Sequence, residues 1–322
     1  MAIPTSLVRR AVTSYLLKRA YCASFELTYN CNARCQHCHR GTPVPNERLA
    51  SPQQLLQICR DIQPIVAVMS GGEPLVRKEL TEIVRLFREA IPPLRIQVNT
   101  NAALLTPKRF DALLEAGLSN FIISFDFPDE RHDEWRAIPG LFRRIEGLIA
   151  GLSPADKKRV VLTSVFQRKN FRDAPRMADV AREWGVSINF SAYTWLRTHD
   201  MDLLIPPDEM GEFREVVDLL LEKRRESGHV LTSAGVFDGM IQFFDKRGMG
   251  GCLAGERLLV VNPDGTYSPC GLHIRDYATR GEMIRDFTRT NTCSACYTSS
   301  RAMAERPGKS FFLEHVHHFR RA

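Results

Sequence analysis

The chain has 322 residues, of which 44% are hydrophobic and 25% are charged, and its 44 Lys and Arg against 37 Asp and Glu give a formal net charge of +7. This balance is typical of a globular protein with a full hydrophobic core, and no apolar run reaches the roughly 20 residues that span a bilayer. The positive excess is scattered along the chain without a long basic block, so nucleic acid is not an expected partner.

Residues 1–21 are predicted to form an amphipathic helix, because apolar residues recur there at helical spacing with Arg9, Arg10, Lys18 and Arg19 between them. We expect this helix to pack on the main domain or, alternatively, to make peripheral contact with a membrane, which would suit a lipid-like substrate. The two adjacent arginines interrupt the apolar stretch and no small-residue cleavage site follows, so a signal peptide is not expected.

From residue 22 to about 200, short apolar runs alternate with helical patterns. One amphipathic helix is predicted with Ile83, Val84 and Phe87 on its buried face, and another is predicted to begin after Thr106 and Pro107. Repeated alternation of strand and helix predicts a parallel sheet that is either open or closed into a barrel. The strand-like runs are 23–28, 66–70, 94–99, 120–125, 160–166 and 186–190.

The pattern changes after residue 200. Two helices are predicted over 206–226 and 236–244, and they are followed by a β-hairpin over 258–269 in which Gly265 supplies the positive φ of the turn. Four cysteines flank and follow this hairpin. We therefore expect a small C-terminal domain of a β-hairpin and helices that is stapled by metal.

Nine cysteines are the informative feature of the composition. An odd number without a secretion signal argues against a disulfide framework and favours metal or redox chemistry in a reducing compartment, so we expect a cytoplasmic protein. Seven of the nine fall into two groups, one near each end of the chain. Cys22 and Cys59 are left over, and both are expected to be structural.

The first group is Cys31, Cys35 and Cys38, which stand as C-x3-C-x2-C directly after the first predicted strand. Three thiolates on a cubane [4Fe–4S] cluster leave one iron without a protein ligand, and an open metal position is where substrate chemistry occurs. The alternative is a zinc site completed by His37 or His39.

Further motifs follow the predicted strands in chain order: Gly71-Gly72-Glu73-Pro74, Ser124-Phe125-Asp126, and His132-Asp133-Glu134-Trp135-Arg136 with Gly140-Leu141-Phe142. Together with the three cysteines, they resemble the motifs of the radical S-adenosyl-L-methionine (radical SAM) enzymes over roughly residues 22–200. The resemblance implies a partial (β/α)6 TIM-like barrel, for which we take residues 22–230. It also implies a SAM-binding [4Fe–4S] cluster on Cys31, Cys35 and Cys38, which a low-potential donor such as flavodoxin or ferredoxin reduces.

The resemblance also implies contacts with SAM. Gly71 and Gly72 allow close backbone approach to the methionine moiety, and Glu73 suits its α-ammonium group. His37 stands where the family usually has an aromatic residue against the adenine, a departure that an imidazole can still fill by stacking. Ser124 would contact the ribose and Arg136 the ribose or the carboxylate; Asn99, Asn101 and Asp126 are further candidates that have structural alternatives.

The second group is Cys252, Cys270, Cys293 and Cys296, and four thiolates can hold either zinc or a [4Fe–4S] cluster. After a radical SAM core, their spacing around the hairpin resembles the SPASM and Twitch domains, and four cysteines are enough for one auxiliary cluster. We therefore expect a Twitch-like auxiliary-cluster domain with a C-terminal tail over 231–322.

A fully ligated cluster is suited to moving electrons, so we expect an oxidoreductase. By the resemblance, it cleaves SAM reductively to a 5′-deoxyadenosyl radical, abstracts a substrate hydrogen and oxidises a small molecule. The alternatives are modification of a peptide or protein, for which few residues precede the predicted core, and action on a lipid or isoprenoid.

Tyr193, Arg197 and His199 follow the sixth strand and are candidate catalytic residues. Candidates for substrate recognition are Trp195, Gln167, Arg168 and Asn170, and the tail over 311–321 either covers the site or packs elsewhere.

Overall fold

The structure is a computed structural model that describes residues 12, 13, 16, 20–92 and 94–305. Most of the predicted helix over 1–21, and all of the tail over 311–321, lie outside the described residues. Among the described residues, every helix is too short or too polar to span a bilayer.

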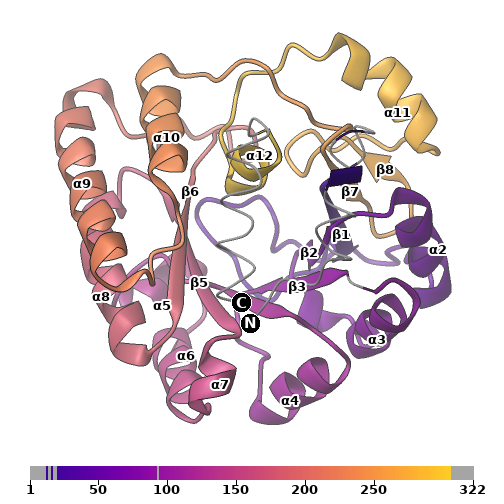
Figure 1. Cartoon of the computed structure of the whole chain (residues 1–322), viewed down its shortest axis with the longest axis horizontal. Coiled ribbons are helices and arrows are strands. Elements are labelled where there is room, and N and C mark those ends of the chain that lie inside the picture. Colours follow the sequence, from indigo (N-terminus) through magenta and orange to yellow (C-terminus); the bar gives the residue numbers. More distant parts are fainter. Residues whose placement is uncertain (1–11, 14–15, 17–19, 93, 306–322) are drawn as a thin grey trace.

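One sheet of eight strands, in the order β6-β5-β4-β3-β2-β1-β7-β8, forms the wall of the fold (Figure 1). Neighbouring strands are parallel except for β7 and β8, which form an antiparallel hairpin. Because β6 and β8 stand at the two ends of this order, the barrel is open, and the predicted partial barrel is confirmed. The strands are β1 (Cys22–Thr28), β2 (Val66–Gly71), β3 (Arg95–Thr100), β4 (Asn120–Ser124), β5 (Val160–Phe166), β6 (Ser187–Ala192), β7 (Leu258–Val261) and β8 (Tyr267–Ser268).

Helices connect the first six strands and cover the outer face of the sheet (Figure 1). Both helices singled out above are present: α3 buries Ile83, Val84 and Phe87, and α4 begins where the Thr106 hydroxyl accepts a hydrogen bond from the Arg109 N–H. The helices are α2 (Pro52–Ile62), α3 (Leu80–Ala90), α4 (Pro107–Glu115), α5 (Arg131–Arg136), α6 (Leu141–Ala150), α7 (Pro154–Lys157), α8 (Ala174–Trp184), α9 (Met210–Ser227), α10 (Ala234–Lys246), α11 (Arg280–Asp286) and α12 (Ser299–Ala304), with 3-10 turns η1 (Pro74–Val76), η2 (Phe171–Asp173), η3 (Pro207–Glu209) and η4 (Thr288–Thr290).

The predicted C-terminal hairpin is present, but it joins the main sheet. Strand β7 pairs in parallel with β1, so that Cys22 lies opposite Leu258 and Phe25 lies opposite Val261. Helix α12 contacts both β6 and β7, and it therefore lies across the open side of the barrel. The segment that carries the second cysteine group is thus built onto the barrel wall by backbone hydrogen bonds as well as by side-chain packing.

Close contacts fasten this segment to β6 and α10. The Thr194 hydroxyl donates to the carbonyl oxygen of Ala295 at 2.7 Å, and the Ser299 N–H donates to the Ser191 hydroxyl at 3.0 Å. Gly239 lies in the middle of α10, where a Cβ atom would overlap the ring of Tyr297. The absence of a side chain on Gly239 therefore lets the residue that follows Cys296 pack directly on the helix.

Gly239→Ala is expected to lower the free energy of unfolding by about 1–3 kcal/mol, because the added methyl group overpacks a buried contact. Gly211→Ala in α9 is the matched control, since a Cβ atom there meets nothing within 4 Å. The control is expected to be neutral or stabilising by up to about 1 kcal/mol, as alanine favours helix. Thermal or denaturant unfolding of the two variants checks the difference, and equal stability of the two would contradict the contact.

Candidate active site

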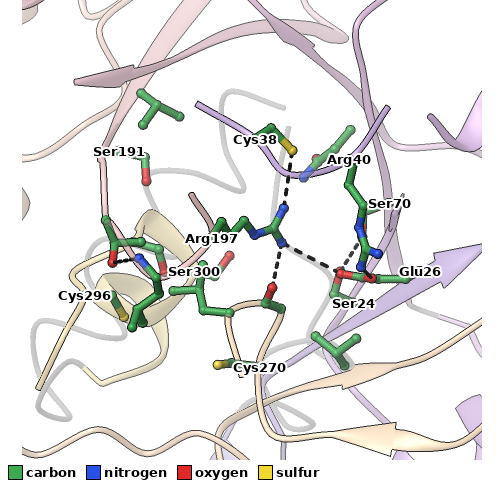
Figure 2. Close-up of a pocket in the computed structure, with 18 of the residues that line it drawn as sticks. Ser24, Glu26, Cys38, Arg40, Ser70, Ser191, Arg197, Cys270, Cys296 and Ser300 are labelled. Carbon is green, nitrogen blue, oxygen red and sulfur yellow. Dashed lines mark hydrogen bonds and ion pairs between the residues drawn. The ribbon is translucent and has the colours of Figure 1, made fainter. Parts of the chain in front are cut away.

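A pocket of about 400 Å³ lies inside the barrel, and all seven cysteines of the two predicted groups line it. The inward-facing residues Cys22, Ser24 and Glu26 of β1 form part of its wall. Figure 2 shows Cys38 on one side of the Arg197 guanidinium and Cys270 on the other. The structure therefore brings together two groups that are more than 200 residues apart in the sequence.

The first cysteine loop follows β1 and is clamped by α5. The Arg34 and Gln36 N–H groups donate to the carbonyl oxygens of Arg136 and Trp135 at 3.2 and 3.3 Å. The Ala33 N–H donates to the Cys31 sulfur at 3.4 Å, and the Arg136 guanidinium donates to the Cys35 sulfur at 3.7 Å. These donors suit thiolates, because hydrogen bonds to sulfur stabilise its negative charge.

The motif His132–Arg136 acts mainly through contacts that hold this loop in place. Arg136 pairs with the fully buried Asp126 at 2.6 Å, and the His132 ring nitrogen Nδ1 accepts a hydrogen bond from the Asp126 N–H at 3.2 Å. Burial opposes ionisation of Asp126, but the Arg136 guanidinium holds the pKa of this carboxyl below its usual value. Asp133 accepts hydrogen bonds from the Gly140 and Phe142 N–H groups, so it caps the start of α6.

Gly71 and Gly72 let the end of β2 pack closely against the residues at the end of β1. Gly71 has a φ of 126°, and a Cβ atom on Gly72 would overlap the carbonyl oxygen of Asn30. Backbone hydrogen bonds from Gly72 to Thr28 and from Glu73 to Asn30 then join the end of β2 to the start of the cysteine loop. The same two glycines leave their backbone open on the pocket side.

Glu73 is buried and hydrogen-bonded at both oxygens. It accepts from the Leu75 N–H at 3.1 Å, the Thr100 hydroxyl at 2.7 Å and the Asn101 N–H at 2.8 Å. Burial raises the pKa of Glu73 and these donors lower it, with a net rise. Since the Asn101 amide also donates to Asn32 at 2.8 Å, Glu73 ties the ends of β2 and β3 to the cysteine loop as well as lining the pocket.

His37 lines the pocket and stacks on a protein ring. Its ring lies 5.6 Å from that of Trp135 at an angle of 10°, and its Nδ1 atom accepts a hydrogen bond from the indole N–H of Trp135 at 2.6 Å. Burial lowers the pKa of His37 to about 4, so the imidazole is neutral at physiological pH. The indole thereby fixes the orientation of the residue that precedes Cys38.

The second cysteine group is gathered by the hairpin and by His273. Cys252 precedes β7 and Cys270 follows β8, so the open ends of the antiparallel pair bring the two together against the same small apolar cluster. The His273 N–H donates to the Cys270 sulfur, and its Nε2 atom lies 3.3 Å from the Cys293 sulfur. Burial raises the pKa of Cys252, Cys270 and Cys296 to about 11 each, so these thiols need a cation to ionise at neutral pH.

Arg301, which is 1% exposed, organises the same group. Its guanidinium donates to the carbonyl oxygens of Cys296, Met249 and Gly250 at 2.7 Å each, and it pairs with Glu305 at 2.8 Å. Glu305 in turn accepts from the Leu253 N–H at 2.7 Å. One buried ion pair therefore joins the segment before β7 to the segment around Cys296.

Several further candidates line the pocket and others do not. Ser124, Asn99, Asn101, Tyr193 and Arg197 line it. Three candidates outside the lining lie elsewhere: His199 is exposed, Trp195 stacks on Phe243, and Arg168 pairs with Glu209 on the surface. Three others are buried but do not line the pocket: Gln167, Asn170 and Asp126. Within the described residues, no three His, Cys, Asp or Glu side chains are gathered closely enough to hold a single metal ion.

Some of the lining residues were not predicted from the sequence. Glu26 and Arg40 form an ion pair of 3.0 Å inside the pocket, and Arg301 was not singled out at all. Cys22 was expected to be structural, but it also lines the pocket, as a thiol whose pKa burial raises to about 12. A signal for Glu26 existed, because it is a carboxylate in an otherwise uncharged strand that is buried on both faces.

Residues 25–181 match the family profile described as "Radical SAM superfamily", so this part of the chain is a radical SAM domain. Among curated relatives, the chain is 28% identical over 272 residues to an AdoMet-dependent heme synthase of Methanosarcina barkeri, which covers 77% of this chain and 76% of that one. It is 26% identical over 266 residues to a PqqA peptide cyclase of Granulibacter bethesdensis, with 76% and 66% covered. The fold is similar to that of Streptococcus suis SuiB bound to the precursor peptide SuiA, with a TM-score of 0.62, 13% identity, and 94% of this chain and 69% of that chain covered.

Asp126→Asn is expected to lower the free energy of unfolding by about 3–5 kcal/mol at neutral pH, because it leaves the buried Arg136 without a counter-charge. Asp173→Asn is the matched control, since Asp173 pairs with an Arg131 that is 48% exposed; it is expected to cost less than about 1 kcal/mol. Denaturant unfolding of the full chain without iron measures both variants. A loss for Asp126→Asn no larger than that of the control would contradict the role of the pair.

The same measurement has a defined pH dependence. The folded-state pKa of Asp126 is depressed, so its contribution is complete above the usual value of 3.8 and is lost as the pH falls through the lower folded-state value. The difference between the wild type and Asp126→Asn is therefore expected to stay constant between about pH 6 and 8 and to shrink below about pH 4.

Proposed function

We propose that this radical SAM enzyme oxidises a polar small molecule with the help of two [4Fe–4S] clusters. The observation that carries the proposal is that Cys31, Cys35 and Cys38 line the same pocket as the C-terminal cysteines. A substrate bound there can face two centres at once, one that starts radical chemistry and one that accepts an electron.

The residues present fit these groups. Cys31, Cys35 and Cys38 would hold the SAM-binding cluster and Cys252, Cys270, Cys293 and Cys296 the auxiliary cluster, and none of these seven is held in a disulfide. Donors from Ala33, Arg136 and His273 already point at the sulfurs, as ligands of an iron–sulfur cluster require. We accordingly assign residues 22–230 to the core and 231–322 to the Twitch-like domain.

The chain's own residues would bind and orient SAM. Gly71 and Gly72 offer open backbone to the methionine moiety, next to the hydrogen-bonded carboxylate of Glu73. Ser124, which lines the pocket, would contact the ribose, and Arg136, which pairs with Asp126 and also lines the pocket, would contact the ribose or the carboxylate. His37, whose ring stacks on that of Trp135, would lie against the adenine.

When bound, the clusters and SAM supply a reductively generated 5′-deoxyadenosyl radical that takes a hydrogen atom from the substrate, and an acceptor for the electron left behind. The substrate thus loses a hydrogen atom, then one electron and one proton, which is a two-electron oxidation. A low-potential donor such as flavodoxin or ferredoxin in the cytoplasm would start each turnover. The task of the chain is to position the substrate between the two cysteine groups and to limit the access of water.

The character of the inner wall supports a polar substrate. Inward-facing strand residues that line the pocket are Ser24 and Glu26 of β1, Ser70 of β2, Asn99 of β3 and Ser191 of β6. Barrel interiors that serve only packing are filled by branched apolar side chains. Hydroxyl, amide and carboxylate groups instead provide hydrogen bonds for a ligand, which favours a polar small molecule over a lipid or isoprenoid.

Two kinds of substrate should be tested against each other. Similarity to the heme synthase of M. barkeri makes a heme precursor a candidate beside aminosugars and cyclitols. Similarity to the PqqA peptide cyclase of G. bethesdensis supports modification of a peptide as the second candidate function.

Anaerobic formation of 5′-deoxyadenosine identifies the substrate class. We expect a large rise over the substrate-free rate with one of the polar small molecules, because a bound substrate supplies the hydrogen atom that makes cleavage irreversible. Cys35→Ala is the control and is expected to form none, since it removes a ligand of the first cluster. A rise seen with peptides and with none of the small molecules would contradict the proposed small-molecule oxidation.

Iron counting tests the two clusters separately. The wild type, prepared anaerobically, is expected to hold about eight irons per chain, and either Cys31→Ala/Cys35→Ala or Cys252→Ala/Cys296→Ala about four. Cys59→Ala, at a buried core thiol outside the pocket, is the matched control and is expected to keep about eight. About four irons with one zinc in the wild type would contradict the auxiliary cluster.

A further inference from the structure

Arg197 reaches both cysteine groups from the loop that follows β6. Its Nη1 atom lies 3.8 Å from the Cys38 sulfur, and its Nη2 atom donates to the carbonyl oxygen of Gly271 at 2.8 Å. Gly271 directly follows Cys270 in the chain. Figure 2 shows the guanidinium between the two loops, and one side chain thus contacts a ligand of the first group and the backbone beside a ligand of the second.

Gly271 and Glu26 lie next to this guanidinium. A Cβ atom on Gly271 would lie 3.0 Å from Arg197 Nη2 and 3.2 Å from Glu26 Oε1, so glycine allows the second loop to approach. Glu26 is 4% exposed, lies 4.0 Å from Arg197 and pairs with Arg40 at 3.0 Å. Two guanidiniums thus share one carboxylate, and a net positive charge remains beside the cysteines.

The loop that carries Arg197 is itself held firmly. The Tyr193 hydroxyl hydrogen-bonds to the Thr198 hydroxyl at 2.6 Å and donates to the Asp200 carbonyl at 2.9 Å. The His199 N–H donates to the Trp195 carbonyl at 2.7 Å, and Trp195 stacks on Phe243 of α10. Tyr193 and Trp195 therefore fix the position from which Arg197 extends.

We propose that Arg197 is a positioning residue that joins the two cysteine groups and lowers the electrostatic cost of reducing the centres they hold. The proposal rests on the proposed function, which places a cluster on each group. A cluster with three or four thiolate ligands is surrounded by negative charge, which opposes the addition of an electron. A cation that donates hydrogen bonds to a ligand sulfur therefore favours the reduced state. Arginine suits this place because its planar fork serves a sulfur and a carbonyl oxygen together.

The consequence is that both reduction potentials depend on one side chain. Arg197 contacts the Cys38 sulfur directly, whereas it reaches the second group through the Gly271 backbone, so the first centre should respond more strongly. Its charge also lies between the two groups, where it reduces the repulsion between electrons held on either side. The substrate, which must lie near the same point, would meet this guanidinium and Glu26.

The test is anaerobic redox titration of each centre by its paramagnetic signal, with iron content measured on the same samples. We expect Arg197→Gln to retain iron while both potentials become more negative, the first centre more than the second. Arg197→Lys keeps the charge and is expected to recover part of the shift. Arg168→Gln is the matched control, since Arg168 follows β5 and pairs with Glu209 on the surface, and it should leave both potentials unchanged.

Gly271→Ala provides a second variant that removes no charge. Its methyl group would lie 3.0 Å from Nη2, on the side away from Cys38, so it disturbs the contact with Gly271 and should shift the second centre more than the first, in the same direction as Arg197→Gln; this variant decides the matter if Arg197→Gln fails to hold iron. Wild-type potentials in Arg197→Gln or in Gly271→Ala would overturn the proposal, and a changed KM alone would make Arg197 a substrate contact. About four irons in the wild type would overturn the auxiliary cluster of the proposed function, whereas the potential of the first centre would still test the contact with Cys38.

Discussion

Buried guanidinium groups hold the cysteine loops, and the site depends on them. The loops that carry the thiols have little regular structure of their own, so their carbonyl oxygens need partners elsewhere. Arg301 supplies three such partners to the second group, and Arg136 stands behind the first as part of a buried ion pair. Arginine suits this task because it has five N–H donors in a rigid plane and stays charged when buried.

These arginines also make the site costly to disturb. A buried ion pair is weak evidence of added stability, but removing one partner leaves a desolvated charge. Asp126, the partner of Arg136, and Glu305, the partner of Arg301, are therefore as important to the site as the thiols. This holds although Asp126 does not line the pocket and Glu305 holds backbone far from the first cysteine group. These contacts help to set the geometry of the cysteine loops.

The elements and the cysteine groups could be predicted from the sequence because they are local patterns. Alternation of strand and helix, the C-x3-C-x2-C spacing and the caps at Thr106 and Pro107 are each contained in a few residues. Arg301 could not be found in this way, since its acceptors at Met249 and Gly250 lie about 50 residues away and nothing near it marks it as buried. The same holds for β7, whose pairing with β1 follows from tertiary packing, and for His199, which is exposed and has a positive φ of 56°.

Strand β1 shows how the barrel separates folding from chemistry. Its outward residues Ala23, Phe25 and Leu27 are fully buried under the helices and supply the hydrophobic stabilisation that the wall needs. Its inward residues Ser24 and Glu26 contribute polar groups to the pocket, and strands β2, β3 and β6 add further polar side chains there. Because successive side chains of a strand point to opposite faces, one short segment can stabilise the fold and line the site at once. Filling those inward positions with valine or leucine would be compatible with the barrel, so their polarity is best explained by what the pocket binds.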